Sequence, residues 1–137
     1  MKLLPSISFQ ENCEEAINYY KDVFGAEVKE ISYLDEAPVD LGIEISSSSR
    51  FVTYAEVVLF GTSVVMTDGA ENQMKNQNFY FTLFFDTEEE VRIVFDKLAD
   101  GGKIVEPLAP KFWARLDGNI VDRFGINWSV LTRESAN

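Results

Sequence analysis

The chain has 137 residues, of which 46% are hydrophobic and 13% aromatic, so it can bury a sizeable core and is too apolar for disorder. Its net charge is −11, and a surface this negative repels phosphate groups, which argues against nucleic acid or an anionic membrane as a partner. No run approaches the roughly 20 apolar residues of a membrane span, and the N-terminal segment lacks a signal-peptide pattern, so we expect a soluble, cytoplasmic protein.

The sequence contains no histidine and one cysteine. A lone cysteine allows neither an internal disulfide nor a cysteine metal cluster. Cys13 lies between Asn12 and Glu14, and there is no histidine to help it form a thiolate. We therefore expect Cys13 to be structural, and the composition argues against an ordinary metal-dependent enzyme.

Two segments have the pattern of an amphipathic helix. The first begins at Asn12, which has capping-box spacing to Glu15, and ends at Gly25. The second begins at Thr87, repeats the spacing at Glu90, and ends at the glycine pair 101–102. The apolar residues that recur at helical spacing are Cys13, Ala16, Ile17, Tyr20 and Phe24 in the first helix, and Val91, Val94, Phe95 and Leu98 in the second.

Strand-like runs surround both predicted helices in the same order. They cover residues 3–9, 27–34, 54–60 and 63–67 in the first half, and 79–86, 103–105, 119–122 and 126–132 in the second. In each half the last two runs meet at a Phe-Gly pair, which predicts a hairpin. The repeated order predicts an α+β fold of two βαβββ modules that form a curved mixed sheet with the helices on its outer face.

The predicted domain organisation follows from this repeat. We expect one domain over residues 1–137, with module one at about 1–70, a linker at about 69–78 and module two at about 79–137. A polar stretch from Asp35 to Arg50, rich in serine, predicts a long loop inside module one.

Several segments in succession carry a family resemblance. They are EEAINYYKDVFG at 14–25, YAEV at 54–57, TD at 67–68, FDTEEEV at 85–91, FWAR at 112–115 and DRFGINW at 122–128. Taken in order, they resemble the PhnB-like branch of the vicinal oxygen chelate superfamily, which includes glyoxalase I, bleomycin resistance proteins and extradiol dioxygenases. The resemblance implies paired βαβββ modules and a homodimer with clefts shaped by both chains.

The resemblance also implies where a metal would be held. Metal-using members place His, Gln or Glu on the first and last strand of each module, and the matching positions by spacing are Pro5, Val65, Tyr80 and Ser129. Proline and valine side chains cannot coordinate, and neutral tyrosine and serine are poor ligands for Zn²⁺ or Fe²⁺. Many PhnB-like proteins also have His where this chain has Tyr54. We therefore expect no metal site and no cofactor.

Candidate binding residues lie on the predicted strands. Glu56 interrupts an apolar run and is either a cleft-facing carboxylate with a raised pKa or an exposed strand residue. Trp113 and Arg115 alternate on one predicted strand, where they either clamp a flat or anionic ligand or cover a dimer interface. Phe79, Phe81, Leu83 and Phe85 would pack under a helix, which turns the opposite face toward the cleft. The predicted ligand-binding set is Phe9, Tyr54, Glu56, Tyr80, Phe84, Trp113 and Arg115.

Two other groups of residues have simpler explanations. We assign Asp68, Asp117 and Asp122 to turn chemistry, because they lie at strand ends or turns. Trp128 lies in phase with apolar neighbours and is expected in the core.

Three functions are compatible with the sequence. The first is a metal-free homodimer that binds a hydrophobic or aromatic small molecule in an apolar cleft. The second is a glyoxalase-like lyase or isomerase, or an oxygenase, with an atypical carboxylate metal site built from Glu56, Asp68 or Asp122. The third is a purely structural or interaction dimer. Methyl transfer is disfavoured because no glycine-rich strand-to-helix turn is present for a nucleotide-like cofactor.

Overall fold

The computed structural model describes residues 2–38, 50–69 and 79–133, and these ranges contain a β-α-β-β-β unit twice over. Most of the loop predicted at 35–50 and of the linker predicted at 69–78 lies outside the described residues. Module one comprises β1 (Ser6–Phe9), α1 (Cys13–Phe24), β2 (Glu27–Tyr33), the short 3-10 helix η1 (Leu34–Glu36), β3 (Val52–Leu59) and β4 (Thr62–Asp68). Module two comprises β5 (Phe81–Phe85), α2 (Glu88–Ala99), β6 (Lys103–Lys111), β7 (Ala114–Val121) and β8 (Asn127–Thr132).

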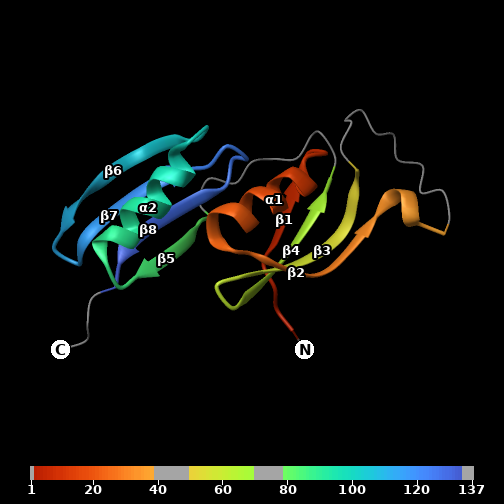
Figure 1. Cartoon of the computed structure of the whole chain (residues 1–137), viewed down its shortest axis with the longest axis horizontal. Coiled ribbons are helices and arrows are strands. Elements are labelled where there is room, and N and C mark those ends of the chain that lie inside the picture. The colour runs from red at the N-terminus through yellow and green to blue at the C-terminus, as the bar shows by residue number, and fades with distance from the viewer. Residues whose placement is uncertain (1, 39–49, 70–78, 134–137) are drawn as a thin grey trace. The chain divides into compact units, whose positions relative to one another are not determined.

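The strands of the described residues form two four-stranded sheets, one in each module (Figure 1). Their strand orders, β1-β4-β3-β2 and β5-β8-β7-β6, are the same arrangement repeated. The pairs β1–β4 and β5–β8 are parallel and the other pairs are antiparallel. The α+β class and the two βαβββ modules are confirmed, and the expectation of one mixed sheet is refined because each module has a sheet of its own.

In module one, α1 lies across one face of the sheet (Figure 1). Burial alternates along β3, so that Ala55 and Val57 are fully buried, whereas Tyr54 and Glu56 are only partly buried. Since successive side chains of a strand point to opposite faces, Tyr54 and Glu56 lie on the helix-free face. The buried layer under the helix is made of Ile7, Phe9, Cys13, Ala16, Ile17, Tyr20, Ala55, Val57, Val64 and Met66.

Module two repeats this layering with α2. Gly118 on β7 allows the close approach of the helix, because a Cβ at this position would lie 2.9 Å from the Phe95 ring. Gly118 is paired with Val130 of β8, and Val130 with Leu83 of β5, so this row lies under the helix. The prediction that one face of this strand packs under a helix is confirmed for Phe81, Leu83 and Phe85. It is wrong for Phe79, which precedes β5 and is 54% exposed. Phe84, on the opposite face, is 61% exposed.

The two helices begin differently, although their sequences suggest the same cap. Thr87 forms the predicted capping box: its Oγ1 accepts the Glu90 N–H at 3.1 Å and donates to the Glu90 carboxylate at 2.9 Å. Asn12 makes no side-chain cap, so the box predicted there is wrong. Gly25 ends α1 as predicted, in the left-handed conformation with φ 68°.

No helix within the described ranges is long and apolar enough to span a membrane.

The N-terminus of α1 is capped instead by a side chain from a distant strand. Asp68, the last residue of β4, accepts the Cys13 N–H on Oδ1 and the Val52 N–H on Oδ2, each at 2.9 Å. The residue is 7% exposed, and burial raises the pKa of its carboxyl while these hydrogen bonds oppose the rise. Asp68 thus joins α1, β3 and β4, and its assignment to simple turn chemistry is wrong.

Module two has a threonine at the matching place. Thr132 ends β8 and is paired with Phe85, as Asp68 ends β4 and is paired with Phe9. The Thr132 Oγ1 accepts the Leu116 N–H at 3.3 Å, which corresponds to the bond from Val52 to Asp68. One acceptor is enough in this module, because Thr87 already caps the helix.

The strand β6 is longer than the sequence indicated. Residues 103–105 were expected, whereas β6 extends to Lys111 in spite of Pro107 and Pro110. It lies at the edge of its sheet, where a proline removes no ladder hydrogen bond if its nitrogen faces outward, and its register is interrupted at three places. Residues 112–113 then form the turn into β7, so Trp113 is not on a strand with Arg115 as predicted.

We predict that Asp68→Asn lowers the free energy of unfolding by about 1–3 kcal/mol, because an amide can accept only one of the two N–H groups and its own NH₂ faces the other. Chemical denaturation followed by circular dichroism measures this change. Asp96→Asn on the exposed surface of α2 is the control and should shift stability by less than about 0.5 kcal/mol. Equal stability of the two variants would contradict the capping role.

Candidate functional site

The helix-free face of module one carries Tyr54 and Glu56. The Glu56 side chain is 13% exposed and lies 3.9 Å from the Lys2 ammonium and 3.8 Å from that of Lys29. Its Oε2 accepts the Ser63 hydroxyl at 3.0 Å. Glu56 is therefore a partly buried carboxylate whose charge is balanced by two lysines. This setting is intermediate between the cleft-facing carboxylate and the exposed strand residue that the sequence allowed.

Phe9 does not share that face. It is paired with Asp68 on β4, is 4% exposed, and lies on the side of the sheet that α1 covers. The first strand therefore turns its apolar residues into the core and exposes Ser6 and Ser8 on the other side. A ligand could reach Phe9 only if the core opened, so its binding role stays a prediction.

The carboxylates proposed for an atypical metal site are each engaged elsewhere. Glu56 and Asp68 lie on opposite faces of one sheet, because Glu56 is paired with Val65 and Asp68 follows three residues later. Asp122 accepts the N–H groups of Phe124 and Ile126 and, at 2.9 Å, the indole N–H of Trp128. Trp128 is 2% exposed, so its place in the core and the turn role of Asp122 are confirmed. Within the described parts of the chain, no three His, Cys, Asp or Glu side chains are arranged to hold a metal ion.

The strand register corrects two of the positions at which the resemblance implied metal ligands. Val65 is paired with Ser6, and Ser129 with Thr82. Pro5 and Tyr80 are therefore not equivalent: Pro5 is one residue before Ser6 and lies on the other face, whereas Tyr80 is two residues before Thr82 and lies on the same face. The matching positions are Ser6, Val65, Thr82 and Ser129. Their side chains are hydroxyls and an isopropyl group, which are poor ligands for Zn²⁺ or Fe²⁺.

On the helix-free face of module two, an apolar row crosses the sheet. The row runs across the four strands from Phe84 of β5 to Leu131 of β8, Asp117 of β7 and Ala109 of β6, and each residue is paired with the next. Leu131 and Asp117 are both 8% exposed, whereas Phe84 is 61% exposed. The row therefore presents a large exposed ring at one end and a buried carboxylate near the other.

Asp117 holds Trp113 at this row. The Trp113 indole N–H donates to the Asp117 Oδ2 at 2.6 Å, and the Lys111 ammonium lies 5.8 Å from the centroid of the indole ring. The Trp113 side chain is 48% exposed. A turn residue is thus tied to the sheet by a buried acceptor, so the role of Asp117 is wider than the turn chemistry we predicted.

Arg115 and Tyr80 lie at the two ends of this face. Arg115 is two residues before Asp117 on β7 and therefore on the same side, and its Nη2 donates to the Asp86 carbonyl at 2.8 Å. Tyr80 precedes β5, is 58% exposed, and is in phase with Phe84. Module two therefore brings Tyr80, Phe84 and Arg115 to one face, where Trp113 is hydrogen-bonded to Asp117. Tyr54 and Glu56 share the helix-free face of module one.

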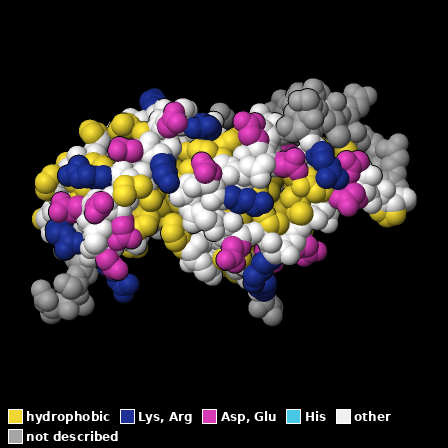
Figure 2. Space-filling model, in the orientation of Figure 1, with side chains coloured by type: hydrophobic (Ala, Val, Ile, Leu, Met, Phe, Trp, Pro, Cys, Tyr) yellow, Lys and Arg dark blue, Asp and Glu magenta, His cyan; other side chains and the backbone are white. Residues whose placement is uncertain are grey.

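Sequence reasoning missed four contributors to these faces: Asp117, Leu131, and Lys2 and Lys29 beside Glu56. Leu131 belongs to an apolar run that the sequence could not divide between faces. The lysines are separated from Glu56 by 54 and 27 positions in the printed sequence, so no local pattern links them. Figure 2 shows acidic and basic side chains interspersed on the visible surface of each module, so the net charge is not gathered in one patch there.

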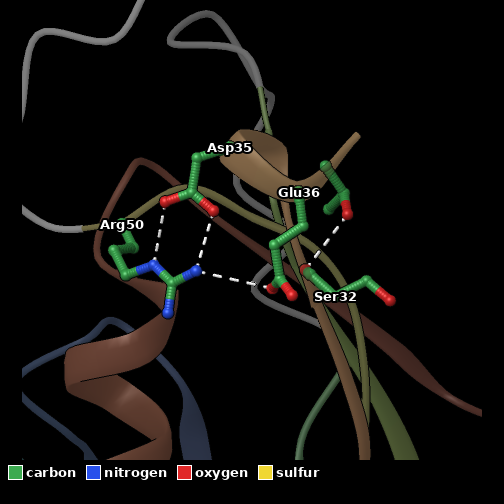
Figure 3. A network of polar contacts seen from close by, with 5 residues as sticks. Ser32, Asp35, Glu36 and Arg50 are labelled. Atoms are coloured by element: carbon green, nitrogen blue, oxygen red, sulfur yellow. Dashed lines mark hydrogen bonds and ion pairs between the residues drawn. The ribbon is translucent and has the colours of Figure 1, made fainter. Parts of the chain in front are cut away.

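A polar network lies at the end of β2 in module one (Figure 3). Arg50 binds the Asp35 carboxylate with two hydrogen bonds of 2.7 and 3.0 Å, and its guanidinium carbon lies 3.6 Å from the centre of the Tyr33 ring. Arg50 also reaches Glu36 at 3.4 Å. The Arg50 hydrogen bond holds the pKa of Asp35 below its usual range. These contacts join the residues on either side of segment 39–49.

The single cysteine is fully buried at the start of α1. Burial, the Asp68 carboxylate and Glu14 together raise the pKa of the Cys13 thiol far above its ordinary value. A thiol in this setting is a small apolar core group, as the sequence predicted, and it is poorly suited to nucleophilic chemistry.

Comparison with known proteins identifies the family. A family model described as 3-demethylubiquinone-9 3-methyltransferase matches residues 1–131. The chain belongs to this family, the PhnB-like branch of the vicinal oxygen chelate superfamily. It is 32% identical to Protein YjdN of Escherichia coli K12 over 139 residues, which is 95% of this chain and 94% of that protein.

Solved structures support the PhnB-like fold. The PhnB protein from Bacillus cereus has a TM-score of 0.82 at 26% identity, over 97% of this chain and all of its own. Protein PA1353 from Pseudomonas aeruginosa has the same TM-score at 25% identity, over 98% and 99% of the two chains. The fosfomycin resistance protein FosX from Listeria monocytogenes has a TM-score of 0.66 at 11% identity, over 98% and 93%, and shares the fold alone.

In this PhnB-like protein, the raised pKa of Tyr33 predicts how the stability of the fold changes at alkaline pH. A hydrogen bond to Glu14, with smaller contributions from burial and the Glu14 charge, raises the pKa of Tyr33 to about 12 from its ordinary value of 10.0. The folded state then holds this proton more tightly, so stability falls as pH rises from 10.0 to about 12. In an alkaline absorbance titration, Tyr33→Phe should remove a transition near pH 12, and Glu14→Gln should move it toward pH 10. Loss of a transition near pH 10 in Tyr33→Phe would contradict the assignment.

Proposed function

We propose that this PhnB-like chain is a single-domain, metal-free protein that binds a hydrophobic or aromatic small molecule and works as a homodimer. The observation that carries the proposal is the helix-free face of module two, where Tyr80, Phe84 and Trp113 are each about half exposed or more. Exposed aromatic side chains gathered on one face of a sheet are uncommon unless something binds them.

The arrangement of this face suits a flat, apolar ligand. Trp113 is fixed at its indole nitrogen by Asp117, so a bound ring would meet a side chain that has already lost part of its freedom. Phe84 stands beside the buried Leu131, which offers an apolar floor between the two aromatic rings. Arg115 and the hydroxyls of Thr82 and Ser129 lie on the same face and would give orientation.

The residues present do not fit the methyl transfer that the family description suggests. A nucleotide-like methyl donor is usually held at a glycine-rich turn between a strand and a helix, where backbone N–H groups approach the ligand. In this chain the two strand-to-helix turns are residues 10–12, Gln-Glu-Asn, and residues 86–87, Asp-Thr. We therefore derive no methyl-transfer step.

Binding is tested by a thermal-shift screen of apolar and aromatic compounds. A ligand at 100 times its Kd stabilises a protein by about 2.7 kcal/mol, which for a chain of this size raises Tm by several degrees. For a compound that binds, Phe84→Ala should raise Kd about tenfold or more, because a buried Phe contributes roughly 1.5–3 kcal/mol. Titration calorimetry measures both Kd values.

The matched control is Ile93→Ala, which removes a side chain that is 48% exposed on α2. It should leave Kd within about twofold of the wild-type value. A broad screen that yields no stabilising compound would count against small-molecule binding, and an equal loss of affinity in the two variants would move the site away from this face.

The homodimer has a candidate interface of its own. The edge strand β6 exposes Ile104 and Val105, by 48% and 61%, and edge strands with exposed apolar residues readily pair with another chain. We expect analytical ultracentrifugation to give twice the 15.5 kDa chain mass. Val105→Lys should shift the protein toward monomer, and Ile93→Lys should not.

The same measurement separates binding from a purely structural dimer. If Phe84→Ala dissociates the dimer and no compound binds the wild type, the aromatic face is an interface between copies. A wild-type mass of one chain would refute the dimer and leave the binding proposal to be judged by calorimetry.

A further inference from the structure

Asp117 carries a nearly buried carboxylate with one oxygen left over. The residue is 8% exposed, and its Oδ2 accepts the Trp113 indole N–H at 2.6 Å. Within residues 2–38, 50–69 and 79–133, no second hydrogen bond and no ion pair reaches this carboxylate. Burial removes the water that stabilises a carboxylate, so a buried one normally has a cation or several N–H donors beside it. One indole donor is less than this charge requires.

The other two buried aspartates of the described chain show the usual arrangement. Asp68 accepts two backbone N–H groups, one on each oxygen. Asp122 accepts two backbone N–H groups on Oδ1 and the Trp128 indole N–H on Oδ2. Both of their oxygens are therefore occupied, whereas the Oδ1 of Asp117 is open. Asp117 differs from them also in its position, because it lies on the helix-free face of its sheet.

The open oxygen can be reached from that face. In the part of the chain that the structure describes, no buried side-chain oxygen or nitrogen lacks a hydrogen-bond partner, so Oδ1 of Asp117 must keep some contact with solvent. Asp117 precedes Gly118, which lies under α2, and successive side chains of a strand point to opposite faces. A ligand that approaches the helix-free face therefore meets this oxygen.

The nearby cations do not neutralise Asp117. The Lys111 ammonium binds the Glu106 carboxylate at 2.5 Å, and the Arg115 Nη2 donates to the Asp86 carbonyl just past the end of β5. Neither forms an ion pair with Asp117 in the described structure. The chain as a whole has a net charge of −11, which attracts cations over a longer range.

We infer that Asp117 recognises a cationic nitrogen, and that the ligand of the aromatic face is a flat aromatic compound carrying a protonated amine. This rests on the proposed function and names the class of ligand. The ammonium group donates an N–H to Oδ1 of Asp117 while Oδ2 keeps the indole. The Trp113 ring also attracts cations, as the Lys111 ammonium 5.8 Å from its centroid illustrates.

The aromatic part of the ligand extends along the apolar row from this point. Leu131 is paired with Asp117, and Phe84 with Leu131, so an aromatic group attached to the ammonium lies on these two side chains. Trp113, held by Asp117, borders the same place. The site therefore combines one anionic oxygen with an aromatic and aliphatic floor.

Three probes of one shape test the inference by titration calorimetry at neutral pH: 2-naphthylmethylamine, which is protonated there, its neutral analogue 2-naphthylmethanol, and the trimethylammonium derivative of the amine. We expect the wild type to bind the amine about tenfold tighter than the alcohol, because a hydrogen bond to a charged group is stronger than one between neutral groups. The trimethylammonium probe keeps the charge but has no N–H, so its Kd should lie within about threefold of that of the alcohol.

Asp117→Asn removes the charge and keeps an oxygen that can accept the indole N–H. It should reduce the preference for the amine over the alcohol from about tenfold to about twofold or less, and leave the Kd of the alcohol within about twofold. The matched control is Asp96→Asn on the exposed surface of α2, which removes the same charge and should preserve the tenfold preference. Circular dichroism checks that both variants fold, and the three probes on the wild type test the inference without any variant.

Equal Kd values of the amine and the alcohol on the wild type would overturn the recognition of a cation, and binding of the alcohol would then leave the proposed function standing. A trimethylammonium probe that binds as tightly as the amine would overturn the role of Asp117, because the cation would be held by an aromatic ring alone. An equal loss of preference in Asp96→Asn would overturn it too, since the effect would be one of general charge. If no probe binds, the inference fails, and the compound screen decides separately on small-molecule binding.

Discussion

Module one depends on a buried carboxylate that joins three elements. Asp68 accepts N–H groups from the first residue of α1 and from the first residue of β3, while its own strand runs through the middle of the sheet. A carboxylate has two oxygens and can satisfy both donors, which would otherwise be buried without partners. The position of α1 over the sheet, and hence the choice of which sheet face stays open, follows from this contact.

The duplicated module reaches the same layering with a smaller group. Thr132 replaces Asp68 at the end of β8 and accepts one N–H, and the helix cap passes to Thr87 at the start of α2. The two modules therefore share a position that must hold a buried acceptor, but they differ in how many donors it serves. This explains why a capping box forms at Thr87 and not at Asn12, where the side chain from β4 already occupies the role.

Once a helix covers one face of a sheet, the other face is the one that a ligand can reach. In module one that face offers Tyr54 and a carboxylate balanced by two lysines. In module two it offers exposed aromatic rings and an indole fixed by Asp117. The second face has more exposed aromatic side chains, so it is the better candidate for ligand recognition.

The sequence by itself determined the duplication, both helices, most strands, the two Phe-Gly hairpins and the core positions of Trp128 and Cys13, because these depend on local periodicity and turn residues. The alternation of serine and apolar residues along Ser6–Phe9 separates two faces of the strand but does not say which one a helix covers, so Phe9 was expected toward a ligand and lies in the core. The sequence placed the first-strand positions at Pro5 and Tyr80, whereas strand pairing places them at Ser6 and Thr82, because the spacing to a helix does not fix the register of a strand. Only the tertiary structure brought Asp68 to α1, and Lys2 and Lys29 to Glu56. Those contacts join elements far apart in the chain, and pairing between strands, not local propensity, decides them.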